Sequence, residues 1–192
     1  MFEKSKTISL LNKERLQKYT PYFKQIEVPA KTILLEEGQV SKRVYWIEKG
    51  CIRVWFNNDG KDITYQFFFE NSTVASIESF RKNIPSAGNM EALEPCTLWY
   101  ADKEDIEFII DEICEEPELR KLFIDKIFQR TFDYMKYFFS AIKDPPQQRY
   151  LDLLKENPQL IQRVPQHYIA SYLGITTVHL SRIKSKLAKS KN

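Results

Sequence analysis

The apolar and polar positions between residues 23 and 100 follow the short, alternating pattern that is typical of β-strands. Runs of β-branched and aromatic residues recur there, and Gly, Asn, Asp and other polar residues separate them. One separator, Asp59-Gly60, favours a type I′ hairpin turn because both residues tolerate a positive φ. The predicted strands are 23–28, 32–35, 44–47, 52–56, 63–69 and 96–100. Many short strands at regular spacing predict an antiparallel β jelly roll.

Helical spacing of the apolar residues flanks this β-region on both sides. Before it, apolar residues in the segment 8–19 predict a short amphipathic helix that Pro21 ends. After it, helical spacing resumes at Lys103, and a long helix is predicted over 118–143, which contains neither Pro nor Gly. A further helix is predicted over 147–156. We therefore expect an α+β protein whose strands precede its main helices.

The long helix has two apolar seams with alternating spacings of three and four residues. A helix with two apolar faces must bury both. One face suits the chain's own β-region, and the spacing of the other suits a two-helix coiled coil with a second copy. The alternative is one helix buried within a single chain. Which of the two seams faces the partner stays open. The first seam consists of Ile124, Ile127, Thr131, Tyr134, Phe138 and Ala141. The second seam consists of Phe128, Phe132, Met135, Phe139 and Ile142. From the first seam come the candidate dimer residues, Ile124, Ile127, Thr131, Tyr134 and Phe138.

The segment 164–184 fits a helix-turn-helix. Gly174 stands where the tight turn between the two helices needs a left-handed residue. Thr176 or Thr177 can cap the second helix. The apolar residues that would pack the two helices together are Ile169, Ala170, Leu173, Leu180, Ile183 and Leu187.

Formal charge is distributed unevenly along the chain. The whole chain has a net charge of only +3, from 29 basic and 26 acidic residues. Residues 102–118 contain nine acidic side chains and one Lys, whereas residues 163–192 contain six basic side chains and no acidic one. A basic end that coincides with a helix-turn-helix predicts binding to double-stranded DNA. The acidic segment is interpreted as a solvated helix face; the alternative is a contact surface for RNA polymerase.

The outer face of the second helix supplies the candidate DNA-binding residues. Arg182 can make a bidentate contact to guanine, and Thr177 and Ser181 suit phosphate or weaker base contacts. The candidate residues are Thr176, Thr177, Val178, His179, Ser181, Arg182, Lys184 and Lys186.

Several classes of protein are disfavoured by composition. With only 5 Gly, 2 His and 3 Cys, the chain has no glycine-rich phosphate loop and no C-x-x-C pair for a structural metal site. No nucleophile or paired-carboxylate constellation points to an enzyme. The segment 1–7 has no apolar stretch behind it, and no window approaches a membrane span. We therefore expect a cytoplasmic protein that is not an enzyme and has no metal, cofactor or membrane partner.

Across roughly residues 5–190 the chain resembles the Crp/Fnr family of bacterial transcription regulators. The resemblance rests on Glu37-Gly38, on the segment 44–54 with Gly50 twelve residues after Gly38, on the long helix and on the helix-turn-helix. It implies a cyclic-nucleotide-binding-like sensor domain over 1–116, a dimerisation helix over 117–143 and a winged helix-turn-helix over 144–192, which binds a near-palindromic operator as a homodimer. The family's wing requires strands, and only 160–164 could supply one.

The sensor region departs from the family pattern. Members that bind cyclic AMP have a Glu for the ribose and, about ten residues later, an Arg for the cyclic phosphate; here Ser76 and Ser86 stand in those places. Without the Arg a charge-assisted contact is lost, so we expect no tight cyclic AMP binding, and the effector is unknown. The candidate effector pocket is Ser76, Ile77, Glu78, Arg81, Ser86 and Ala87.

The functional hypothesis is a dimeric, sequence-specific DNA-binding transcription regulator. The alternative is a small-molecule sensor that acts through protein contacts and whose helix-turn-helix has lost DNA binding.

Overall fold

The computed structural model describes residues 17–189. These residues divide into two compact units, one made of 17–56 and 66–125 and the other of 57–65 and 126–189. Residues 8–16 of the first predicted helix lie outside the described residues, and the described chain begins with a short 3-10 helix, η2 (Thr20–Tyr22). Each unit is described by itself below.

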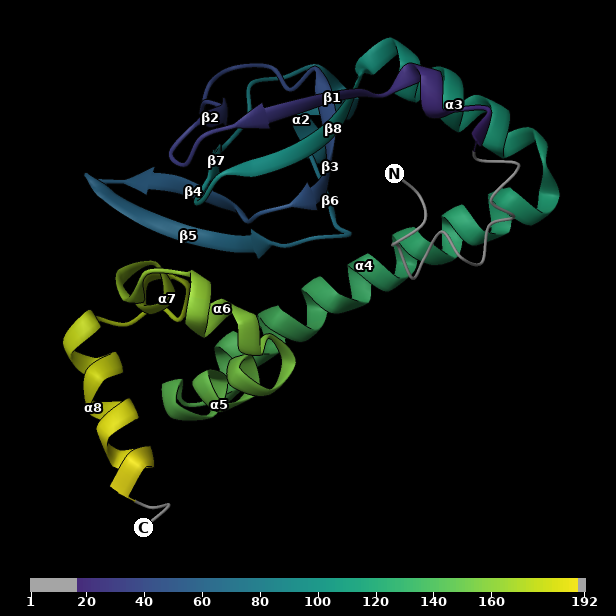
Figure 1. Ribbon diagram of the computed structural model, residues 1–192. Helices are drawn as coiled ribbons and strands as arrows, with labels where there is room; N and C mark the ends of the chain where they lie inside the picture. Colours follow the sequence, from purple (N-terminus) through teal and green to yellow (C-terminus); the bar gives the residue numbers. More distant parts are fainter. Residues whose placement is uncertain (1–16, 190–192) are drawn as a thin grey trace. The chain divides into compact units, whose positions relative to one another are not determined.

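Two four-stranded sheets form the β-structure, and they lie face to face as the predicted jelly roll (Figure 1). The first sheet has the strand order β1 (Lys24–Val28), β8 (Cys96–Asp102), β3 (Arg43–Lys49) and β6 (Thr73–Val74). The second has the order β2 (Ile33–Leu35), β7 (Asn89–Ala92), β4 (Ile52–Asn58) and β5 (Lys61–Phe68). The recorded strand pairs are antiparallel, and β5 lies at an edge.

The space between the sheets is filled by apolar side chains from both. Ile47, Ile52 and Leu98 are completely buried at its centre, and Tyr45 and Phe68 add large rings. Alternation along the strands directs these residues inward. Burial of such side chains contributes about 1.5–3 kcal/mol each, so this cluster is the main source of stability in the first unit.

Turn chemistry accounts for the hairpin and for one tight connection. Asp59 and Gly60 both have positive φ, 51° and 80°, as the predicted turn between β4 and β5 requires. Gly50, between β3 and β4, has φ 111°, and a Cβ there would overlap Cys96. Only glycine adopts this positive φ without strain and also leaves room for the Cys96 side chain.

Helices occupy most of the remaining chain. They are α2 (Ile77–Lys82), α3 (Lys103–Glu115), α4 (Pro117–Lys143), α5 (Pro146–Glu156), α6 (Pro158–Arg163), α7 (Gln166–Tyr172) and α8 (Thr177–Lys189). α4 begins one residue before the predicted long helix and ends with it at Lys143, and Asp144-Pro145 separates it from α5. No helix of the described residues is long and apolar enough to cross a membrane.

The predicted wing strand over 160–164 is wrong. Residues Pro158–Arg163 form the helix α6 instead, and the described chain between 146 and 189 contains only helices and their connections. Pro158 suits the first helical position because its missing N–H is not needed there. Leu160 lies on the inner side of this short helix, where it is buried. Burial of that side chain outweighs the β-propensity of the neighbouring Ile161 and Val164.

Candidate nucleic-acid interface and sensor site

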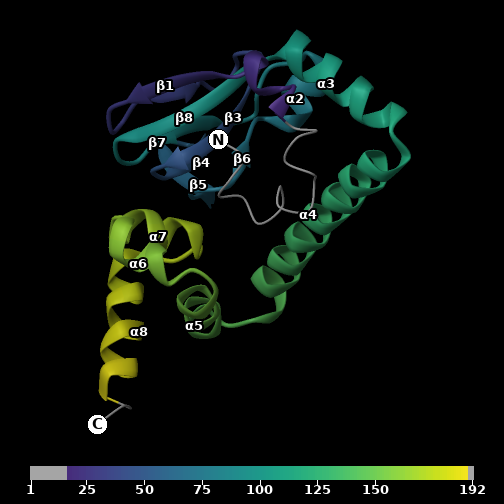
Figure 2. The same ribbon diagram turned by 45° about the vertical axis from the view of Figure 1, so that its right-hand side comes forward.

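The two helices α7 and α8 and the turn between them form a complete helix-turn-helix (Figure 2). The amide of Ile175 donates to the carbonyl of Ala170 at 3.0 Å, and that of Gly174 donates to Ser171 at 2.9 Å. With φ +64° at Gly174, this pair of bonds is a Schellman ending, which satisfies carbonyls left open at the end of α7. The predicted turn and its glycine are therefore confirmed.

The second helix begins at the predicted cap. Thr176 Oγ1 accepts a hydrogen bond from the His179 amide at 3.1 Å, which satisfies one of the open donors of the first turn of α8. Ile169, Ala170, Leu180 and Ile183 are buried between the helices. This packing fixes which face of α8 points outward.

All eight candidate DNA-binding residues are exposed. Arg182 and Lys186 line one hollow on the surface of α8 together with Ser181. Lys184 lies to the side, where its Nζ donates to Gln166 Oε1 of α7 at 3.0 Å. The structure thus brings Ser181, Arg182 and Lys186 onto one face of α8, and Lys184 joins the two helices through its bond to Gln166.

Two residues of this face were missed in the sequence analysis. Ser185 and Lys189 line the same hollow as Arg182. Their positions, three and seven residues after Arg182, are the helical neighbours of that side chain. The spacing was sufficient to include them, and we now add both to the candidate interface.

The sensor candidates Ser76 and Ser86 lie side by side. Their hydroxyl groups share a hydrogen bond of 3.0 Å, and Ser86 Oγ also donates to the Gly88 carbonyl at 2.7 Å. Ser79 holds the same loop from within, since its Oγ accepts from the Ser41 amide and donates to the Ile84 carbonyl. In the described structure the two serines thus bond to neutral groups alone. Binding of an anion at this place would require a cation.

The other four sensor candidates face solvent or nearly so. Ile77 is 53% exposed, and Arg81 and Ala87 are exposed. Glu78 forms an exposed ion pair with Lys82, 2.7 Å away, and this bond lowers the pKa of Glu78. Only Ser76 and Ser86 are therefore brought together, and the assignment of the other four to a pocket stays a prediction.

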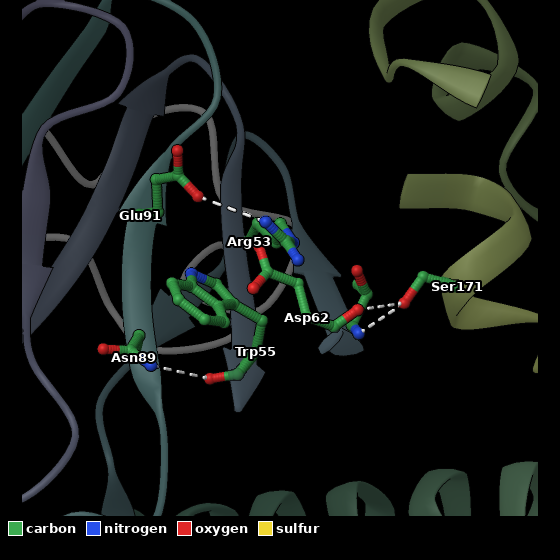
Figure 3. Close-up of polar contacts among 7 residues, drawn as sticks. Arg53, Trp55, Asp62, Asn89, Glu91 and Ser171 are labelled. Carbon is green, nitrogen blue, oxygen red and sulfur yellow. Dashed lines mark hydrogen bonds and ion pairs between the residues drawn. The ribbon is translucent and has the colours of Figure 1, made fainter. Parts of the chain in front are cut away.

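A buried ion pair on the second sheet was not foreseen from the sequence. Arg53 on β4 and Glu91 on β7 are register partners, and Nη1 of the arginine lies 3.3 Å from Oε2 of the glutamate (Figure 3). Arg53 also stacks 5.0 Å from the ring of Trp55. Because Ile52 and Met90 occupy the core face of these strands, the pair lies on the opposite face of the sheet.

Both apolar seams of α4 are exposed along most of their length. The exposed fractions reach 64% at Phe138 and 70% at Ile142. Tyr134 of the first seam is instead half-buried, with its ring 6.2 Å from that of Tyr65. Apart from Tyr137, the large hydrophobic residues exposed on α4 are Ile124, Ile127, Phe128, Phe132, Met135, Phe138, Phe139 and Ile142, which we call the α4 stripe.

Comparison with known proteins agrees with this geometry. Residues 25–112 match the model of the cyclic nucleotide-binding domain family. The jelly roll and the paired serine loop lie within the matched range. No protein of curated function matches the sequence.

Solved structures share the fold over nearly the whole chain. CLP of Xanthomonas campestris, described as a c-di-GMP-responsive global regulator, has a TM-score of 0.72 at 14% identity, covering 94% of this chain and 93% of CLP. A CooA mutant from Carboxydothermus hydrogenoformans has a TM-score of 0.72 at 16% identity, with 99% and 87% covered. FixK2 from Bradyrhizobium japonicum has 0.74 at 15% identity, with 88% and 86% covered. At 14–16% identity these matches show a shared fold, which confirms the predicted fold class.

Proposed function

We propose that the chain is a homodimeric transcription regulator that binds a near-palindromic DNA operator through α8. The observation that supports this most strongly is the basic face of α8. It presents Arg182, Lys186 and Lys189 on one side of a helix, and no acidic residue occurs between 163 and 192. Lys and Arg attract phosphates, and a helix of this kind enters the major groove.

The α4 stripe supports the homodimer. Large apolar side chains exposed at intervals of three and four residues are the pattern that a second, identical helix covers by knobs-into-holes packing. A dimer with two-fold symmetry would present two copies of α8, matching the symmetry of a palindromic operator. The acidic residues of α3 are interpreted as a solvated helix face, with contact to RNA polymerase as the alternative.

The sensor site supports a regulator that does not bind cyclic AMP tightly. Ser76 and Ser86 bond to each other, and neither offers the charge that a cyclic phosphate needs. No group of three or more His, Cys, Asp or Glu among residues 17–189 could hold a metal ion. We propose a non-enzymatic, cytoplasmic protein without a cofactor, whose effector is unassigned.

The test is DNA binding by variants of Arg182. Arg182→Ala should weaken binding to a selected operator by about 1–3 kcal/mol if the guanidinium contacts a guanine. Arg182→Lys is the matched control, since it retains the charge and loses the bidentate geometry. It should keep affinity for random duplex DNA while losing preference for the operator. Equal operator affinity in all three proteins would contradict the proposal.

A further inference from the structure

The elbow between α4 and α5 consists of Asp144 and Pro145 (Figure 2). The Asp144 amide still donates to the Ser140 carbonyl at 2.9 Å, so the helical bonding of α4 continues into the elbow. Both elbow residues precede a proline, which restricts the ψ angle of each to a range of about 40° rather than to one value. The connection therefore narrows the angle between α4 and α5 without fixing it.

An ion pair crosses this elbow. Nζ of Lys136 on α4 is paired with Oε1 of Glu156, the last residue of α5, and the hydrogen bond between them raises the pKa of Lys136. The two side chains are 67% and 36% exposed, so the pair is modest in strength and weakens as salt rises. Because α5 is about 16 Å long, a contact at its far end resists rotation about the elbow.

A second contact lies beside the first. The Tyr137 side chain shares a hydrogen bond with Asn157, the residue between α5 and α6, and the Asn157 carbonyl accepts from the Leu160 amide at 3.0 Å. Burial raises the pKa of Tyr172 at the end of α7, and the charges of Tyr137 and Glu156 raise it further. The end of α4, the junction of α5 with α6, and the first helix of the helix-turn-helix therefore meet around Tyr137.

Polar side chains line the joint between α4 and the end of α5. A hollow of about 250 Å³ lies there, and its lining residues are Asp133, Lys136, Tyr137, Glu156 and Asn157. Loss of a contact at such a surface hollow leaves no cavity in an apolar core, which is the usual cause of a large loss of stability. Single substitutions should therefore loosen the joint while the protein stays folded.

The angle at the elbow bears on how a dimer reads DNA. The second half of α4 and the helices α5–α8 belong to one compact unit. If two α4 helices pair through the α4 stripe, the angle between α4 and α5 in each chain sets the separation of the two copies of α8. That separation must match the distance between half-sites. A shift of about 3.4 Å along the duplex already equals one base pair.

We propose that the contacts Lys136–Glu156 and Tyr137–Asn157 form an elbow brace that determines the spacing between operator half-sites. The brace rests on the proposed function, because it needs both the dimer and DNA binding by α8. Its four members are positioning residues: they act on α8 through α5 and α7 and need no contact with DNA.

Reversal of the charges tests whether the ion pair forms in the full-length protein. Lys136→Glu and Glu156→Lys each bring like charges together, and the double variant Lys136→Glu, Glu156→Lys restores an opposite-charge pair. Each single variant should lower the midpoint of urea unfolding, and the double variant should recover it. Lys126→Glu is the matched control, since it makes the same change of charge at an exposed position of α4 outside the stripe.

Affinity for operators of altered spacing tests what the brace does. The duplexes carry the half-sites selected by the wild type, at the selected distance or one base pair closer or farther apart. The charge-reversed single variants should reduce the preference for the selected distance about three- to tenfold, the effect of one or two modest contacts. The double variant should restore the preference, and Tyr137→Phe should reduce it by a smaller factor. Lys126→Glu should weaken binding at every spacing alike.

Three distinguishable results would overturn the brace. A double variant that recovers no stability means that the ion pair does not form in solution. Recovered stability with an unchanged spacing preference in the single variants means that the pair stabilises the fold without positioning α8. If the wild type selects no DNA, or binds single half-sites as tightly as pairs, the proposed dimeric regulator itself fails and the brace falls with it, although urea unfolding still reports on the ion pair.

Discussion

Ser76 and Ser86 share a hydrogen bond of 3.0 Å at the place where the resemblance to the Crp/Fnr regulators would put a ribose and a cyclic phosphate. Both hydroxyls are thereby engaged with each other, and Ser86 Oγ also lies within hydrogen-bond distance of the Gly88 carbonyl oxygen. A ligand that entered between them would have to break these bonds. It would gain only neutral hydrogen bonds in return, which are weaker than bonds to a cation.

Cyclic AMP should therefore not bind this protein tightly. Calorimetric titration of the full chain should give no heat attributable to a site at micromolar concentrations. The double variant Ser76→Glu, Ser86→Arg restores the family's charges and should bind more tightly than the wild type. Micromolar affinity of the wild-type chain would contradict our account of the sensor.

Arg53 and Glu91 should stabilise the second sheet only as a pair. Arg53→Met leaves the Glu91 carboxylate buried without its cation, which should lower the free energy of unfolding by about 1.5–3 kcal/mol. Combining Arg53→Met with Glu91→Leu removes both charges and should recover most of this loss. Urea unfolding measures both values. A double variant less stable than Arg53→Met would show that the unpaired Glu91 carboxylate is not the cause of the lost stability.

Asp102 should make stability depend on pH in the acid range. Hydrogen bonds from Arg43 and Lys24, 2.9 and 3.0 Å away, lower the pKa of Asp102. A lowered folded-state pKa contributes stability above the unfolded pKa of about 3.9, and this is lost as pH falls through the folded pKa. The stability difference between wild type and Asp102→Asn should thus shrink as pH falls below about 4. A difference independent of pH between 6 and 2 would exclude this carboxylate as the cause.

The α4 stripe should be the dimer interface. Phe132→Glu places a charge in its middle and should weaken dimerisation by about 2–4 kcal/mol, as loss of a central aromatic contact does. Sedimentation equilibrium measures the change in dimer affinity. Lys126→Gln alters the net charge equally at an exposed position outside the stripe and should leave the dimer intact. A wild-type chain that is monomeric at micromolar concentration would contradict the assignment.

Sequence patterns were sufficient for the elements whose signals are local. Asp59-Gly60 predicted the hairpin turn, and the spacing from Ala170 to Ile183 predicted the helix-turn-helix, because each depends on neighbouring residues. β7 was not predicted, because its polar residues Asn89 and Glu91 are buried. The strand therefore lacks the alternation of apolar and polar positions that marks a strand in the sequence. The segment 160–164 was assigned to a strand because its β-propensity was weighed without the packing that makes it helical.

The contacts that join distant segments could not be predicted from the sequence. The partners Arg53 and Glu91 are 38 residues apart, and nothing local to either names the other. Ser171 bonds to a backbone amide 107 positions away. Such contacts depend on strand register and on which faces meet, which are set only when the whole fold is assembled.

Selection of DNA sites from a random duplex library tests the central claim most directly. The full-length protein should enrich a near-palindromic sequence whose half-sites are about 10 base pairs apart, or a multiple of that distance, as two copies of α8 on a two-fold dimer require. Arg182→Ala should abolish the enrichment at one guanine in each half-site. Failure of the wild-type protein to enrich any sequence over the starting library, at low salt and micromolar concentration, would contradict the assignment of this chain as a sequence-specific DNA-binding regulator.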